Sequence, residues 1–178
     1  DIERESFVVG FSKPYRCPPE IQNLTDCYAG RCQPDHELLK RGVREDTIRV
    51  VTCSEKRVRQ KVGKEISALL GEGLQPWDIA VISVRGKGVK ENICHNEALG
   101  GHKVVLATAN DAGSQIICDT FLRFKGLERP VVIVTDLRLV PNLYETRMHI
   151  AVSRALSILR IVEVEAVIRK DSTLAELI

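Results

Sequence analysis

The sequence has no apolar run near the ~20 residues that a membrane-spanning helix needs, so we expect no membrane partner. Its first residues, DIERES, are charged and do not resemble a signal peptide. A net charge of only +2 does not by itself indicate a nucleic-acid-binding protein. With 44% hydrophobic and 28% charged residues, the composition excludes collagen-like and disordered classes. We expect a cytoplasmic protein, at the nucleoid in a bacterium or in the nucleus of a eukaryote.

Several motifs of nucleotide and ester chemistry are also absent. The sequence contains no GxxxxGK[ST] phosphate-binding loop, no GxGxxG turn and no GxSxG elbow. Asp136 ends an apolar segment, where an acid that holds magnesium would stand, but without a phosphate loop this match is weak. The chain alone is therefore not a complete nucleotide hydrolase. Because it begins with Asp1, we expect residues 1–178 to be a single C-terminal domain of a longer chain.

The six cysteines lack the C-x2-C spacing that identifies many zinc sites. Cys17, Cys27, Cys32 and His36 nevertheless follow one another closely, so a zinc-stabilised interaction module stays open as an alternative. Without a secretion signal, free thiols in a reducing compartment are the simpler expectation.

The positive charge is concentrated between residues 40 and 64. This segment has nine basic and three acidic residues, a local charge of +6. Such a segment is typical of a solvated helix face. The alternative is a track for a phosphate backbone, as in a nucleic-acid-binding or regulatory module without motor activity.

Hydrophobic periodicity predicts alternating strands and helices. The expected strands cover residues 6–11, 47–53, 77–84, 103–108, 115–120, 130–137 and 157–164. The expected helices begin at Pro18–Pro19, cover 55–72, run from about 85 to 99, and cover 143–156, with a last helix or frayed tail over 168–178. This alternation predicts an α/β layered fold with a mainly parallel sheet flanked by helices. Ligands of such folds bind at the carboxyl ends of the strands, so we expect the functional residues in the loops that follow the strands.

Three polar segments fall near predicted strand ends. They are KPYRCPPEI (13–21), TFLRFKGLERPVVIV (120–134) and RMHIAVSRA (147–155), which contain PYR (14–16), TFLRFKGLERPVV (120–132) and HIAVSRA (149–155). Arginine recognises phosphate oxygens in a bidentate geometry and stabilises the charge that develops in phosphoryl transfer. Arginines and a Lys-Gly-Leu-Glu turn that converge from separate strand ends would therefore suit a polyphosphate.

In these segments the chain resembles the second motor domain, 2A, of superfamily 1 helicases of the UvrD/Rep/PcrA kind, a RecA-like fold. That family has NYR at the start of the domain, TxHxxKGLExxxV as motif V and YVAxTRA as motif VI. The order and spacing agree over essentially the whole chain. The sequence departs from the pattern at Leu122, His149 and Ser153, where the family has His, Tyr and Thr.

The resemblance implies a role for each motif residue in an ATP-dependent DNA helicase or translocase. Arg154 would be the arginine finger and Arg16 would reach the γ-phosphate. Tyr15 would stack on adenine, Glu128 would contact the ribose, and Gly126 would lie beside the nucleotide. Single-stranded DNA, with RNA as the alternative, would pass close to Thr120, Arg123 and Lys125. The N-terminal motor domain of the same protein would hold most of the ATP and its Mg²⁺, so the isolated domain is expected to be inactive.

Overall fold

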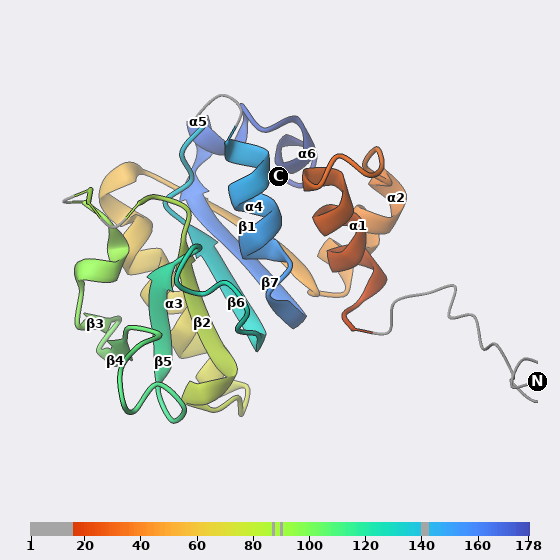
Figure 1. Cartoon of the computed structure of the whole chain (residues 1–178). Coiled ribbons are helices and arrows are strands. Elements are labelled where there is room, and N and C mark those ends of the chain that lie inside the picture. Colours follow the sequence, from red (N-terminus) through yellow and green to blue (C-terminus); the bar gives the residue numbers. More distant parts are fainter. Residues whose placement is uncertain (1–15, 87, 90, 140–142) are drawn as a thin grey trace, which may run out of the picture.

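The computed structural model describes residues 16–86, 88–89, 91–139 and 143–178. Its centre is a seven-stranded sheet with the strand order β1-β7-β6-β2-β5-β4-β3 (Figure 1). The strands are β1 (Ile48–Cys53), β2 (Ile79–Ser83), β3 (Ala98–Leu99), β4 (His102–Val105), β5 (Ile116–Thr120), β6 (Arg129–Thr135) and β7 (Ala155–Val164). All neighbours pair in parallel except β3 and β4. The predicted α/β fold with a mainly parallel sheet is confirmed.

Helices flank this sheet. They are α1 (Pro19–Tyr28), α2 (His36–Arg44), α3 (Val58–Gly71), α4 (Tyr144–Val152), α5 (Glu165–Ile168) and α6 (Ser172–Ala175), with 3₁₀ helices η2 (Glu55–Arg57), η3 (Pro76–Asp78) and η4 (Ile93–His95). Figure 1 shows α4 in front of the sheet, α3 behind it and α1 beside α4. None of the helices in the described part of the chain has the length and apolarity that crossing a membrane requires.

The central strands are apolar on both faces because a helix covers each face. Along β6, Val132 and Val134 belong to the core cluster under α1 and α4. Val131 and Ile133, which alternate with them, belong to the cluster under α3. Each cluster buries one side of the period-2 pattern. The continuous apolar run that predicted this strand thus reflects burial on both faces.

Two helical predictions need correction, and the predicted strand at 6–11 lies outside the described residues. The helix expected over 85–99 is wrong: that segment contains η4 and β3. Asn92 holds it as a turn, since its Nδ2 donates to the carbonyl oxygens of Arg85 and Gly86 at 3.3 and 3.2 Å. Helix α4 also ends earlier than predicted, at Val152, and β7 begins at Ala155. Helix α2 was not predicted.

Candidate functional site

Three motif residues that are far apart in the sequence meet at the amino edge of the sheet. This is the edge opposite to the carboxyl ends of the strands, where the functional residues were expected. Arg16 lies shortly before α1, Glu128 directly precedes β6, and Arg154 directly precedes β7. Because β6 and β7 are parallel, the residues that precede them lie at the same edge. The Arg16 guanidinium forms an ion pair with the Glu128 carboxylate. It also lies 3.5 Å from the carbonyl oxygen of Ser153, the neighbour of Arg154.

The last turn of α4 positions the Arg154 side chain. Its Nε donates to the carbonyl oxygen of Ile150 at 3.2 Å, which holds the guanidinium against the end of the helix. Partial burial lowers the pKa of Arg154, and the positive charge of Arg16 lowers it further. The two guanidinium groups are therefore close enough to repel each other. An anion between them would relieve that repulsion.

A cavity of about 240 Å³ opens beside this pair. It is lined by Arg16, Cys17, Gln22, Thr25, Arg31, His149, Ser153 and Arg154. Of these described residues, three are arginines and none is acidic. Sequence reasoning missed Thr25 and Arg31, because neither belongs to a motif and Thr25 stands within an ordinary helical pattern.

The Lys-Gly-Leu-Glu turn also reaches the amino edge. Gly126 has φ of +91°, a conformation that L side chains rarely adopt, and the space beside its Cα is open. Two residues later, Glu128 is partly exposed and is held by Arg16. The structure thus brings Gly126 and Glu128 to the edge where Arg16 and Arg154 lie. Tyr15 lies outside the described residues.

The three predicted nucleic-acid residues do not form one exposed patch. Thr120 ends β5 and is only 4% exposed, whereas Arg123 and Lys125 point to solvent. Thr120 acts in the fold, since its carbonyl oxygen accepts the backbone N–H of Phe124 at 3.0 Å. Phe124 is fully buried and anchors the segment that carries both cations.

Arg147 is a further cation at the carboxyl edge. Its guanidinium lies 5.4 Å from the ring centroid of Phe121, which directly follows β5. Its Nη1 lies 3.5 Å from the carbonyl oxygen of Val84, which directly follows β2. Sequence analysis placed Arg147 within the third motif segment but gave it no role.

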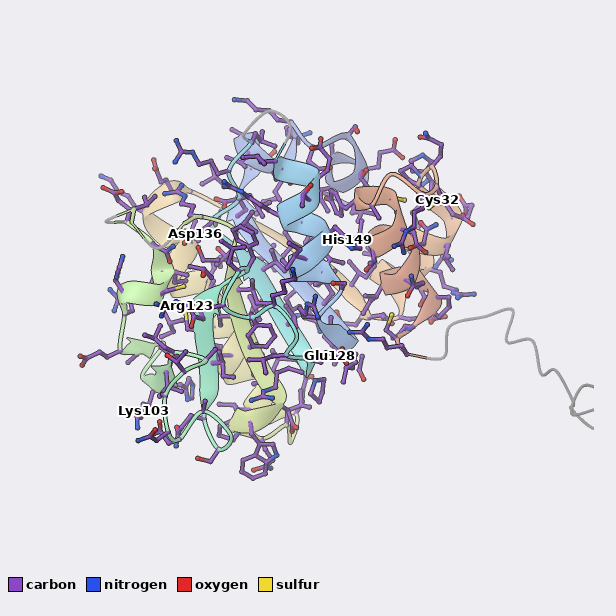
Figure 2. All side chains as sticks on the ribbon, in the orientation of Figure 1. Cys32, Lys103, Arg123, Glu128, Asp136 and His149 are labelled. Carbon is purple, nitrogen blue, oxygen red and sulfur yellow. The ribbon has the colours of Figure 1, made fainter. Side chains whose placement is uncertain are left out.

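The segment 121–128 connects the two edges. It leaves the carboxyl end of β5 and returns to the amino end of β6, so it must cross the length of the parallel strands. Figure 2 shows Glu128 at one end of β6 and Asp136 at the other end. Arg123 lies at an intermediate level along the strand direction in this view. One short segment therefore carries exposed cations and reaches the Arg16–Arg154 site.

Asp136 lies at the carboxyl edge, away from that site (Figure 2). Its Oδ2 accepts hydrogen bonds from Ser83 Oγ at 2.8 Å and from the backbone N–H of Ile93 at 2.9 Å. These contacts fasten η4 to the ends of β2 and β6. This carboxylate oxygen is thus engaged in hydrogen bonds within the protein. Asp136 also lies apart from the arginines that would recognise phosphate.

The structure does not gather the four candidate zinc ligands. Cys27 and Cys32 lie with their sulfur atoms 3.5 Å apart, but Cys17 Sγ donates to Gln22 and His36 Nδ1 contacts Glu176 at 2.6 Å. In the described ranges, no group of three His, Cys, Asp or Glu side chains has a geometry that could hold a metal ion. All six cysteines are free thiols.

Ion pairs within the protein neutralise part of the basic segment 40–64. Lys40 pairs with Glu37, Arg41 with Glu20, and Arg49 with Asp46 and Glu65. These three cations form ion pairs within the protein, so fewer than nine basic side chains of this segment are available to a phosphate backbone.

Comparisons with known proteins agree with this fold. No protein-family model matches the chain, and no curated protein does. Among solved structures, the chain is similar to the C-terminal domain of a possible DNA helicase from Lactobacillus plantarum WCFS1, with 22% sequence identity and a TM-score of 0.63. The match covers 93% of this chain and 95% of that domain. At this identity the likeness establishes a shared fold.

Proposed function

We propose that this chain is the second motor domain of an ATP-dependent DNA helicase or translocase of the UvrD/Rep/PcrA kind. Arg154 acts as the arginine finger, and Arg16 contacts the γ-phosphate. Tyr15, Gly126 and Glu128 contribute to the nucleotide site, while Thr120, Arg123 and Lys125 lie along single-stranded DNA, or RNA. The partner is the N-terminal motor domain of the same protein, which supplies the phosphate loop and the ligands of Mg²⁺.

The convergence of Arg16, Glu128 and Arg154 at the amino edge carries this proposal. Arg16 and Glu128 are in direct contact although they are 112 positions apart in the sequence. Arginine forks match phosphate oxygens, and Glu128 can accept hydrogen bonds from ribose hydroxyls. The described side chains at this edge thus fit half of a triphosphate site. The fold shared with the C-terminal domain of a possible DNA helicase gives further support.

The path of the segment 121–128 suggests how ATP would be coupled to movement. It carries Arg123 and Lys125, whose exposed charges suit a phosphate backbone. Its last residue, Glu128, contacts Arg16 in the nucleotide site. Closure of the two motor domains on ATP would pull on Glu128, and the segment would transmit that shift to the bound strand.

The decisive experiment is the single-strand-stimulated ATPase of the longer protein that contains both motor domains. We expect Arg154→Ala to lower kcat by about 10³-fold, as loss of an arginine finger does. The matched control is Arg169→Ala, which removes an exposed arginine paired only with Glu165 on the surface helix α5. Circular dichroism would check the fold of both variants. Equal ATPase in the two variants would refute the finger role of Arg154.

A second candidate function is nucleic-acid binding without motor activity. It is favoured by cations of the segment 40–64 that form no ion pair among the described residues, such as Lys61 and Lys64 on α3. This candidate predicts binding of single strands that needs no nucleotide and falls steeply with salt. A longer protein with no ATPase would favour it over the motor.

A further inference from the structure

The cavity beside Arg154 contains two groups to which no helicase motif assigns a role. Arg31 follows α1, is 67% exposed, and pairs through Nη1 with Asp26 Oδ1 at 3.2 Å. Thr25 lies on α1 and is only 5% exposed. Its hydroxyl oxygen is buried and has no hydrogen-bond partner among the described residues. Both residues line the same cavity as Arg16 and Arg154.

The buried hydroxyl of Thr25 has no hydrogen-bond partner among the described residues, so it is free to donate to a ligand in the cavity. A buried polar group without a partner destabilises the fold, so buried hydroxyls are nearly always hydrogen-bonded. The nearby His149 Nδ1 cannot accept this hydroxyl, because it donates to the backbone carbonyl oxygen of Thr25 at 3.1 Å. A ligand with acceptor oxygens in the cavity could accept a hydrogen bond from this hydroxyl.

The charge and size of the cavity indicate which ligand this is. Three guanidinium groups line it without an acidic neighbour in the lining, which selects an anion. Its volume of about 240 Å³ is below the ~300 Å³ at which sites for whole small molecules begin. A tetrahedral oxyanion fits both properties, because it is small and offers several oxygens to several donors at once.

We propose that this cavity binds a phosphoryl group, and that Arg31 and Thr25 are ligands of it together with Arg16 and Arg154. In the motor, which is the proposed function on which this part rests, the occupant is the terminal phosphate of ATP, or the phosphate released from it. The exposed ion pairs of Arg31 with Asp26 and of Arg16 with Glu128 leave guanidinium N–H groups that can reach the anion.

The test uses the 178-residue chain and inorganic phosphate, titrated calorimetrically at constant ionic strength with chloride as the other anion. We expect saturable binding that Arg31→Gln and Thr25→Val each weaken about tenfold, the effect of losing one hydrogen bond to a charged group. Thr25→Ser keeps the hydroxyl and is expected to retain binding. Arg169→Gln is the matched control for charge, because Arg169 lies on the surface helix region after α5 and pairs with Glu165.

The possible results separate the two proposals. Absence of saturable phosphate binding in the wild-type chain, or equal binding by Arg31→Gln and Arg169→Gln, would overturn the phosphate site. Because Arg31 is exposed, its replacement does not endanger the fold, and melting temperatures would verify this for Thr25→Val. If phosphate binds as expected but Arg154→Ala leaves the ATPase of the longer protein intact, the phosphate site stands and the motor assignment falls.

Discussion

At the scale of single residues, one buried carboxylate holds the helical side of the molecule together. Asp171 Oδ2 accepts hydrogen bonds from the hydroxyls of Tyr28 and Tyr144, each at 2.6 Å. Its Oδ1 accepts the backbone N–H groups of Thr173 and Leu174 and so caps α6. Burial, and then the negative charge of Asp171, raise the pKa of both tyrosines above the ordinary value.

These raised pKa values predict a loss of stability at alkaline pH. In the unfolded chain a tyrosine loses its proton near pH 10, whereas Tyr28 and Tyr144 keep theirs in the fold. Above pH 10 the unfolded state then binds fewer protons, so the free energy of unfolding falls as pH rises, by up to about 1.4 kcal/mol per pH unit for each tyrosine. Below pH 10 this contribution is constant.

Urea unfolding at pH 9, 10 and 11, followed by circular dichroism, measures the effect. Tyr28→Phe removes one of the two groups, so its stability is expected to fall less steeply above pH 10 than that of the wild type. The variant also loses a hydrogen bond, which shifts its curve at every pH, so the slope is the informative quantity. Parallel curves for variant and wild type would contradict the prediction.

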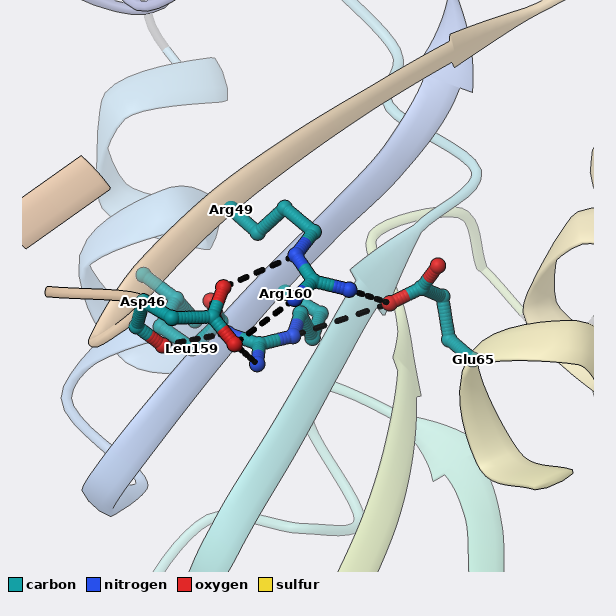
Figure 3. Close-up of polar contacts among 5 residues, drawn as sticks. All are labelled: Asp46, Arg49, Glu65, Leu159 and Arg160. Carbon is teal, nitrogen blue, oxygen red and sulfur yellow. Dashed lines mark hydrogen bonds and ion pairs between the residues drawn. The ribbon is translucent and has the colours of Figure 1, made fainter. Parts of the chain in front are cut away.

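At the scale of elements, a buried arginine joins four parts of the chain (Figure 3). Arg160 on β7 is 1% exposed and donates to the carbonyl oxygen of Asp46 at 2.8 Å and to its Oδ2 at 2.6 Å. Arg49 on β1 donates to both carboxylate oxygens of Asp46 and contacts Glu65 on α3. Asp46 itself forms the turn between α2 and β1, with φ of +58°.

Asp46→Asn is expected to destabilise the fold by about 2 kcal/mol, because the buried Arg160 loses its ion pair with Asp46 at 2.6 Å and keeps the longer one with Glu65 at 3.6 Å, while Asn still tolerates the positive φ. Urea unfolding measures this, with Glu165→Gln in the exposed pair to Arg169 as a control expected to cost under about 0.5 kcal/mol. Adding Arg160→Met to Asp46→Asn removes the buried charge that has lost its Asp46 partner and is expected to recover part of the loss. No recovery, or a loss equal to the control, would show that the network does not stabilise these elements.

Prediction from sequence worked best for elements with many buried apolar residues, because the spacing of those residues reveals whether the element is a helix or a strand. Strand β6 and helix α3 met this condition, since their apolar residues fill the two core clusters. Helix α2 did not, because only Leu39 and Gly42 are buried along it. The segment 85–99 contains apolar residues that pack as a turn, and their spacing does not reveal the side-chain contacts of Asn92 that hold it.

The candidate site shows the same limit. The resemblance of the motifs to helicases selected Arg16, Glu128 and Arg154, which the structure places at one edge. Arg31 and Thr25 come to that edge only through the packing of α1 beside α4, which no local pattern encodes. The buried position of Thr120 was also not foreseen, because a motif gives the residue's identity and not its exposure.

At the scale of the whole molecule, the two proposed functional surfaces lie at opposite edges of one sheet. The arginine cavity lies at the amino edge, and the exposed cations of the segment 121–128 begin at the carboxyl edge. Several parallel strands span the distance between the edges, and a sheet buried on both faces is stiff. If the chain is the proposed motor domain, its movement relative to the other motor domain would therefore reach both surfaces together.

This arrangement makes the nucleic-acid surface separately testable in the 178-residue chain. If Arg123 and Lys125 contact a single-stranded phosphate backbone, replacing either with Ala is expected to reduce the slope of log affinity against log salt by about 0.7, the value for one phosphate contact. Fluorescence anisotropy of a labelled oligothymidylate over a series of KCl concentrations measures that slope. Lys103→Ala is the matched control, because Lys103 is an exposed cation on β4 that pairs with Asp111 away from this segment (Figure 2). A slope that changes as much in Lys103→Ala as in Arg123→Ala would mean that the strand binds by general charge attraction, and the segment 121–128 would then have no special part in holding it.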